Sequence, residues 1–345
     1  MSQIYFLIFN GKFYIRRKNI PKNSLLNRLV KIVLPILLGV VILYFLFRDT
    51  DFSELWSILQ KANWGILAFS LLFGLLGNTI RGYRWQLIIN PLGYTPKVST
   101  LNYAIYGGYA VNFALPRAGE VWRCGIVAKE ENIPFVKLFG TMILDRILDT
   151  LTVLMLVLVA FLFNMEFFIS ELGNNPSFGS IAKLLQSPWL YIASVVAITF
   201  VIAIFKFFGK NPLIKKVKDF AVGMKNDLKA IWRMKTKNRL FLYTIGIWGS
   251  YFLYFYITFF AFGFTSDLGI VAGLTAFALS SLSMGVPTNG GMGAWHFAVV
   301  AALSLYGIDR TQSMAFATGV FTLQSLWVII CGLGGLAALA IRKQK

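Results

Sequence analysis

A group of three charged residues inside an apolar stretch is the first place where this sequence could do chemistry. Asp145, Arg146 and Asp149 follow a hydrophobic run that begins near Leu138. At about 1.5 Å of rise per helical residue, Asp149 would lie about 16 Å along that helix, close to the middle of a bilayer. A charge at that depth must face protein or water and have a partner. The group therefore predicts part of a substrate or proton path, or alternatively a buried ion pair that fastens this helix to a neighbour.

A second charged cluster comes directly after Pro116. Arg117, Glu120 and Arg123 are spaced i, i+3 and i+6, so they would form one stripe on a helix. The planar guanidinium group suits a phosphate, and the carboxylate could orient it or meet a cationic headgroup. We therefore expect a lipid-headgroup or ion path here, although an ordinary interfacial anchor would show the same pattern.

Arg81 and Arg84 are secondary candidates because they follow the apolar stretch 64–80. Arginines at the end of a membrane helix often extend to the interface with their apolar stems in lipid, and that role needs no ligand. The pair is therefore a weaker prediction than the two clusters above.

A glycine-rich segment provides the remaining secondary candidates, Asn289, Gly290, Gly291, Gly293 and His296. Glycines allow the backbone to approach another element or a ligand closely. A helix that begins near Gly293 would direct its positive end into the protein. His296 is the one histidine of the chain and could titrate near neutral pH, or it could be a hydrogen-bonded interior residue.

The common hydrolase motifs are missing from the sequence. It contains no HExxH and no GxSxG, and Cys124 and Cys331 stand far apart. We therefore predict no catalytic residue, metal ligand or cofactor, and an enzyme is not the favoured interpretation. A membrane-embedded enzyme that acts on a lipid-linked substrate, and a non-catalytic partner of an envelope protein, both remain open.

The composition predicts the kind of secondary structure that carries these candidate residues. Of 345 residues 57% are hydrophobic and 14% charged, with a mean hydropathy of +0.68, which excludes a soluble globular domain. Stretches of about 20 apolar residues predict membrane-spanning helices. The fold class predicted is an all-α polytopic membrane protein with about six full transmembrane helices plus two broken or re-entrant helical hairpins. The six helices are expected over residues 31–47, 64–80, 138–163, 188–208, 240–262 and 312–340.

The two broken hairpins are expected over residues 101–116 and 270–306. The first is short and ends at Pro116, and the second is interrupted by Pro287 and several glycines. Non-helical backbone at membrane depth persists only where it faces protein or a watery cavity. Paired interrupted segments resemble those of transporters with inverted repeats, so such a repeat is possible. Two ordinary short spans in each place are the alternative.

The distribution of basic residues predicts how the chain is oriented in the membrane. The net charge of +19 is concentrated at the N-terminus, the C-terminus and residues 206–239, and positive segments are retained in the cytoplasm. We expect a basic cytoplasmic N-terminus over 1–30, one membrane domain over 31–341 that includes a basic cytoplasmic loop at 209–239, and a cytoplasmic tail at 342–345. The basic residues flank membrane segments rather than a recognition motif, so nucleic acid is not an expected partner.

Four short motifs in order resemble the flippase-like membrane family typified by the N-terminal membrane region of lysylphosphatidylglycerol synthases. The resemblance covers roughly residues 30–340. Its marks are Arg81-Gly-Tyr-Arg84-Trp, Leu-Pro-Arg117-Ala-Gly-Glu120-Val-Trp-Arg123, Asp145-Arg146-Ile-Leu-Asp149 and Pro-Thr-Asn289-Gly290-Gly291-Met-Gly293. The family typically has glutamate where this chain has Asp145, and an acidic residue follows its glycine-rich motif where this chain has His296.

The resemblance implies a lipid translocator of the cytoplasmic (inner) membrane. Its partners would be membrane lipids, either anionic or aminoacylated phospholipids, with the headgroup crossing a buried charged cavity. No aminoacyl-transferring domain follows in the sequence, so lipid aminoacylation is not expected. The oligomeric state is not predicted.

Overall fold

The computed structural model describes residues 3–9, 12–18, 43–44, 52–115, 118–165, 236–286 and 288–342. The predicted span over 31–47, apart from residues 43–44, the predicted span over 188–208 and most of the basic loop 209–239 lie outside these residues.

Four of the predicted spans are helices long and apolar enough to cross a membrane. They are α3 (Trp64–Ile89), α6 (Phe135–Phe163), α11 (Lys237–Tyr256), which continues into the 3-10 helix η2 (Ile257–Ala261), and α14 (Arg310–Arg342). The prediction of a polytopic helical membrane protein is confirmed by these elements.

Helix α3 is longer than the sequence indicated. It begins after Asn63, whose side chain caps the backbone N–H groups of Gly65 and Ile66, and it continues past Arg81 and Arg84 to Ile89. The expected boundary at residue 80 was wrong because arginine was taken to mark the interface. Charged side chains can remain inside a membrane helix when carboxylates of another helix compensate them. Asn90-Pro91-Leu92 then forms the 3-10 helix η1.

Of the two predicted broken segments, 270–306 is a pair of short helices, whereas 101–116 is one helix, α4 (Val98–Ala114), whose partner α5 (Ala118–Glu130) lies beyond the predicted range. α4 and α5 pack against each other. α12 (Ile270–Ser283) is followed by the 3-10 turn η3 (Asn289–Gly291) and α13 (Ala294–Ser304). With 14 and 11 residues, α12 and α13 are each too short to cross a core of about 30 Å.

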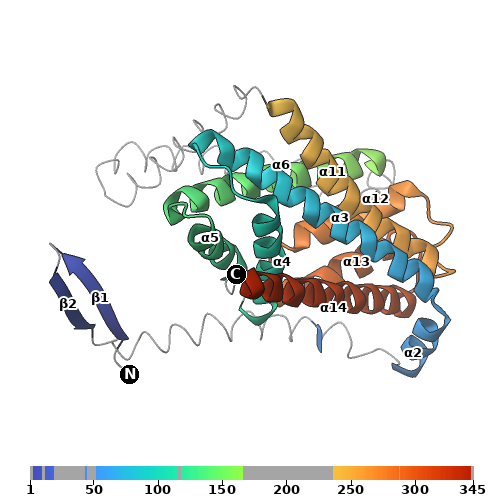
Figure 1. Ribbon diagram of the computed structural model, residues 1–345. Coiled ribbons are helices and arrows are strands. Elements are labelled where there is room, and N and C mark those ends of the chain that lie inside the picture. Colours follow the sequence, from blue (N-terminus) through green and yellow to red (C-terminus); the bar gives the residue numbers. More distant parts are fainter. Residues whose placement is uncertain are drawn as a thin grey trace, which may run out of the picture.

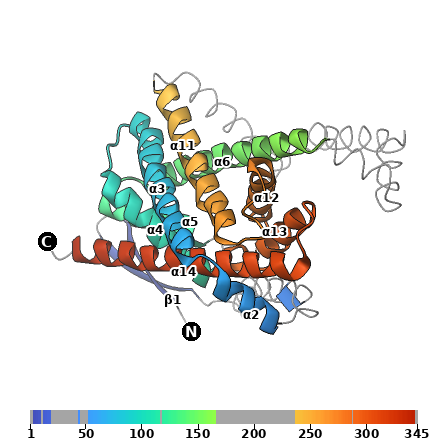
Figure 2. The same cartoon turned by 90° about the vertical axis from the view of Figure 1, so that its right-hand side faces the viewer.

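Among the described residues, the eight larger helices form two sets with the same order of lengths. The first set is α3, α4, α5 and α6, with 26, 17, 13 and 29 residues, and the second is α11, α12, α13 and α14, with 20, 14, 11 and 33. α3 and α11 pack side by side, as Figure 1 shows. The last helix of each set packs on the second helix of the other, α6 on α12 and α14 on α4. In the turned view of Figure 2, α6 and α14 lie on opposite sides of the α3–α11 pair.

A two-stranded hairpin and a short helix precede these sets. β1 (Gln3–Phe9) and β2 (Lys12–Lys18) form an antiparallel hairpin. Asn10-Gly11 separates them in the sequence and is a dipeptide favoured in two-residue hairpin loops, a signal that an interpretation based on charge alone missed. α2 (Phe52–Lys61) buries Leu55 and Leu59 and packs on α14.

Candidate functional site

Two arginines of α3 face two aspartates of α6 inside the protein. Arg84 Nη2 lies 2.6 Å from Asp145 Oδ1 and 2.6 Å from Asp149 Oδ1. Arg81 Nη1 lies 2.5 Å from Asp149 Oδ2 and 3.3 Å from Asp145 Oδ2. The i, i+3 spacing on α3 and the i, i+4 spacing on α6 place each pair on one helix face. We call these four residues the inner ion-pair network.

The inner ion-pair network is buried inside the protein. The side chains of Arg84 and Asp145 are 0% exposed, and Arg84 also donates from Nε to Asp145 Oδ1 at 2.9 Å. Arg81 and Arg84 were ranked as secondary candidates, yet they are the main partners of the two aspartates. A buried charge without a partner costs several kcal/mol, so four mutually paired charges fix how α3 packs on α6.

Arg146 joins the inner ion-pair network to α5. Its Nη2 lies 3.0 Å from Asp149 Oδ2, an i, i+3 contact within α6, and 3.3 Å from Asp145 Oδ2. Its Nη1 lies 3.8 Å from Glu120 Oε1, at the long limit for an ion pair. Arg146 and Glu120 are 35% and 30% exposed, so this is the open side of the cluster.

Arg123 is buried on the same side and has few partners. Its Nη2 is 3.4 Å from Asp145 Oδ2, a long contact, and its Nε has no hydrogen-bond partner. Its guanidinium carbon lies 4.7 Å from the ring centroid of Trp85, which stacks beneath it. Trp85 is held by its own hydrogen bond to Thr141 at 3.0 Å. The position of Arg123 is therefore set by stacking more than by ion pairing.

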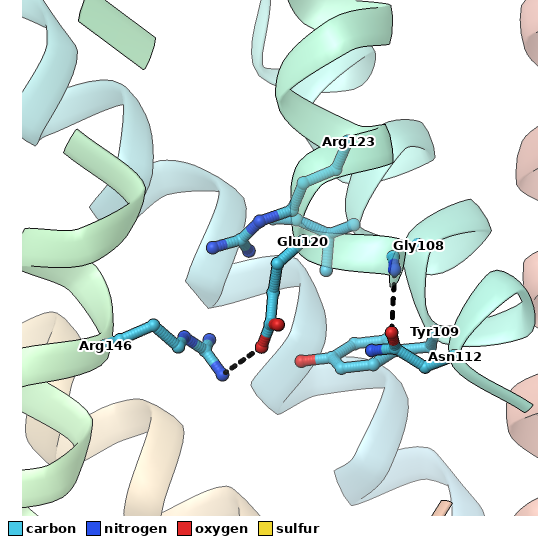
Figure 3. A pocket seen from close by; sticks show the side chains of 8 residues that line it. Gly108, Tyr109, Asn112, Glu120, Arg123 and Arg146 are labelled. Atoms are coloured by element: carbon cyan, nitrogen blue, oxygen red, sulfur yellow. Dashed lines mark hydrogen bonds and ion pairs between the residues drawn. The ribbon is translucent and has the colours of Figure 1, made fainter. Parts of the chain in front are cut away.

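Glu120, Arg123 and Arg146 open onto a small pocket with a cavity volume of about 10 Å³ (Figure 3). That is room for about one water molecule, so a larger ligand requires the surrounding helices to move apart. We call this pocket the arginine pocket. Its lining comes from α4, α5 and α6 and consists of Ile105, Gly108, Tyr109, Asn112, Gly119, Glu120, Arg123 and Arg146.

Tyr109 and Asn112 line the pocket but were not predicted from the sequence. Asn112 accepts a hydrogen bond from the backbone N–H of Gly119 at 2.7 Å and so ties α4 to the first turn of α5. A Cβ atom on Gly108 would lie 2.9 Å from the carbonyl oxygen of Gly119. This close approach of two backbones brings Tyr109 to the pocket. The only signal of this approach in the sequence was the glycine at positions 108 and 119, where the two backbones meet.

The glycine-rich segment lies beside the end of α4. Gly290, with φ of 60°, is so close to Phe113 that an added Cβ would lie 2.6 Å from its ring. His296 is buried on α13, its ring 4.5 Å from that of Phe321, and its Nδ1 has no hydrogen-bond partner. Its recorded contacts are thus aromatic rather than with the arginine pocket. Gly291 and Gly293 also have positive φ angles, and Asn289 begins η3. Arg117, Pro116 and Pro287 lie outside the described residues.

Comparison with known proteins gives three relatives of note. Glycosyltransferase AglD of Haloferax volcanii is 23% identical over 346 residues, which cover 92% of this chain and 55% of that protein. A UPF0104 membrane protein of Methanocaldococcus jannaschii is 30% identical over 155 residues, 44% of this chain and 41% of that protein. One of Pyrococcus horikoshii is 23% identical over 334 residues, 91% of this chain and 98% of that protein. The chain thus spans about half the length of AglD.

The search of solved structures gives no significant match. Residues 32–332 match the family described as the lysylphosphatidylglycerol synthase TM region. That match takes in the first set of helices, the second set up to residue 332 within α14, and every described residue of the charged cluster. The chain is therefore a multi-pass membrane protein and belongs to the family of lysylphosphatidylglycerol synthase transmembrane regions.

Proposed function

We propose that this protein binds the phosphate-bearing headgroup of a membrane lipid in the arginine pocket and moves it across the cytoplasmic membrane. The observation that carries this proposal is the pocket itself. Two guanidinium groups, those of Arg123 and Arg146, line it, and each has a buried Nε without a partner. Guanidinium groups bind phosphate oxygens with strong, directional hydrogen bonds, and a buried donor left without a partner is costly.

The charged residues divide into two roles under this proposal. The inner ion-pair network holds α3 on α6, because its oxygens are already engaged by arginines and Asp145 is fully buried. Glu120, Arg123 and Arg146 contact the ligand, because they line the open pocket. Arg117 precedes α5 in the sequence and lies outside the described residues, so its role as a headgroup ligand stays a prediction from the sequence. Asp145 is fully buried and engaged by arginines, so it does not contact the headgroup in this proposal.

Movement of the headgroup is supported by the arrangement of short helices. The two sets of helices repeat the same order of lengths, and each set places its last helix on the second helix of the other. Such reciprocal packing is what an inverted repeat would produce. In this proposal α4–α5 and α12–α13 are the two hairpins of that repeat. The close contact of Gly290 with the ring of Phe113 connects the two hairpins.

The test is headgroup-resolved lipid translocation in proteoliposomes made with lipids extracted from the host. Wild type is compared with Arg123→Gln and with Lys129→Gln, a matched control because Lys129 is an exposed cation of the same helix α5. We expect one lipid class to move with wild type and the control and at least about tenfold more slowly with Arg123→Gln. If correctly folded wild type moves no lipid with or without an ion gradient, translocation is wrong.

A second candidate is an enzyme, or part of one, that acts on a lipid-linked sugar. The observation that favours it is a match to a protein named as a glycosyltransferase, which covers 92% of this chain at 23% identity. It predicts that the purified protein forms a new glycosylated product from a lipid-linked sugar and that Glu120→Gln abolishes this turnover while lipid still binds. Translocation without any product would contradict this candidate.

A further inference from the structure

We infer that the arginine pocket selects a lipid with one negative charge, a phosphate diester, and that Glu120 sets this preference. The inference deepens the proposed function but rests only on its binding step. It narrows a choice that the family resemblance left open, between anionic and aminoacylated phospholipids.

The charge balance of the cluster carries the first step. Among the described residues, the guanidiniums of Arg81, Arg84, Arg123 and Arg146 are linked by ion pairs to the carboxylates of Asp145, Asp149 and Glu120. Four positive charges thus meet three negative charges, and one positive charge remains. In a medium of low dielectric constant an uncompensated charge is unfavourable, so a single negative charge on the ligand completes the cluster.

The position of the unbalanced charge carries the second step. Asp145 and Asp149 are taken up by Arg81 and Arg84 at 2.5 to 2.6 Å. Arg123 reaches Asp145 at only 3.4 Å. Arg146 is 3.0 Å from Asp149 but shares that carboxylate with Arg81 and Arg84, and it reaches Glu120 at only 3.8 Å. Both guanidiniums line the arginine pocket, and Figure 3 shows their side chains converging with that of Glu120. The unbalanced charge therefore belongs to the pocket and not to the inner ion-pair network.

Glu120 is the residue whose charge can change without disturbing the inner ion-pair network. Its recorded ion-pair partner is Arg146, and its side chain is 30% exposed. Removal of this carboxylate would leave two unbalanced positive charges in the pocket, so the preferred ligand would carry two negative charges. The comparison of wild type with Glu120→Gln depends on a difference of one charge, so charges outside the described residues cancel in it.

Two kinds of membrane lipid supply a singly charged phosphate diester. One is a glycerophospholipid such as phosphatidylglycerol, and the other is a polyisoprenyl phosphate that carries a sugar. Phosphatidic acid is a monoester with nearly two negative charges at pH 7. Lysyl-phosphatidylglycerol carries two amines beside its phosphate and is net positive, so the positive pocket disfavours it.

The experiment is native mass spectrometry of the full chain in detergent at pH 7 with an equimolar mixture of these four lipids. For wild type we expect one or both diesters to be retained about tenfold over lysyl-phosphatidylglycerol and in preference to phosphatidic acid. The diester that is retained identifies the source. Glu120→Gln should shift the ratio of phosphatidic acid to diester upward by about tenfold, and Arg123→Gln should remove the preference for anionic lipid.

Glu130→Gln is the matched control, since it removes the same charge at the last residue of α5, and it should keep the wild-type ratio. Each variant is first shown to be monodisperse with a melting temperature close to that of wild type. The inference is overturned if folded wild type and Glu120→Gln have the same lipid preference, or if wild type prefers lysyl-phosphatidylglycerol or retains none of the phosphate lipids. A clear charge switch without any translocation would instead contradict the proposed function and leave this inference standing.

Discussion

At the scale of single residues, the two aspartates of α6 differ from Glu120 in what they have for partners. Asp145 is fully buried and accepts from Arg84 at two nitrogen atoms, 2.9 and 2.6 Å away. Glu120 is partly exposed and reaches Arg146 only at 3.8 Å. A buried ion pair that loses one member leaves the other charge uncompensated, whereas a loose, partly exposed pair contributes little to stability.

Replacement of Asp145 by asparagine should therefore destabilise the protein strongly. The change leaves Arg84 and Arg81 short of a compensating charge, at a cost of about 3–5 kcal/mol. Thermal unfolding in detergent, followed by tryptophan fluorescence, measures the loss. Glu120→Gln, which removes a carboxylate from the open side, should change the free energy of unfolding by no more than about 1 kcal/mol. Equal melting temperatures for Asp145→Asn and wild type would show that the network does not hold α3 on α6.

At the scale of elements, the arginine pocket depends on how closely α4 and α5 approach each other. A Cβ atom added to Gly119 would collide with the carbonyl oxygen of Gly108, while one added to Gly125, on the same helix, would meet open space. The backbone contact at Gly119 thus sets the separation of the two helices at the pocket.

Gly119→Ala and Gly125→Ala should consequently have opposite effects. Forcing α4 and α5 apart should cost about 1–3 kcal/mol and weaken lipid binding. Alanine at position 125 should stabilise the helix by about 0.5–1 kcal/mol, because alanine loses less backbone entropy on folding than glycine does. Chemical or thermal unfolding of both variants, together with lipid retention, checks this pair. A stable Gly119→Ala protein with normal lipid retention would mean that the approach is not needed.

The contact between the two broken segments allows a similar comparison. Gly290 and Gly307 have φ angles of 60° and 76°, but only Gly290 faces a neighbour within 4 Å, the ring of Phe113. Alanine is strained at both positions, so their difference isolates the steric contact with α4. We expect Gly290→Ala to lower the translocation rate several-fold more than Gly307→Ala does, at comparable melting temperatures. Equal rates for the two variants would argue that the segments do not work together.

At the scale of the whole molecule, the two sets of helices share a plan while their interiors differ. The first set carries the described charged cluster, and the second is rich in aromatic contacts among Phe255, Phe259, Phe277 and Phe316. The charged groups that line the arginine pocket therefore belong to the first set, and the second set contributes an aromatic core.

The orientation of the protein in the membrane is a further prediction. The excess of lysine and arginine at the two ends and in residues 206–239 predicts that both termini lie in the cytoplasm. A green fluorescent protein fused to either end should fluoresce, whereas alkaline phosphatase fused there should be inactive. An active phosphatase fusion at the C-terminus would reverse the orientation.

The sequence by itself determined the class of the fold, because a bilayer leaves backbone amides no partner outside their own segment. Apolar length therefore predicted α3, α6, α11 and α14, and glycine and proline predicted the breaks after α4 and α12. The exact end of α3 was not predictable, since an arginine reads as an interface residue until its buried partner is known.

A charge in apolar surroundings is costly and usually has a partner or a function. On that ground the sequence also identified five candidate residues: Asp145, Arg146, Asp149, Glu120 and Arg123. Only the tertiary structure decided which of these charges compensate one another and which face open space. The carboxylates of Asp145 and Asp149 meet Arg81 and Arg84 across more than 60 residues of chain, a pairing that no local spacing encodes. The arginine pocket arises from the close contact of α4 with α5 and from the packing of α6 beside them, so it exists only when three helices have come together.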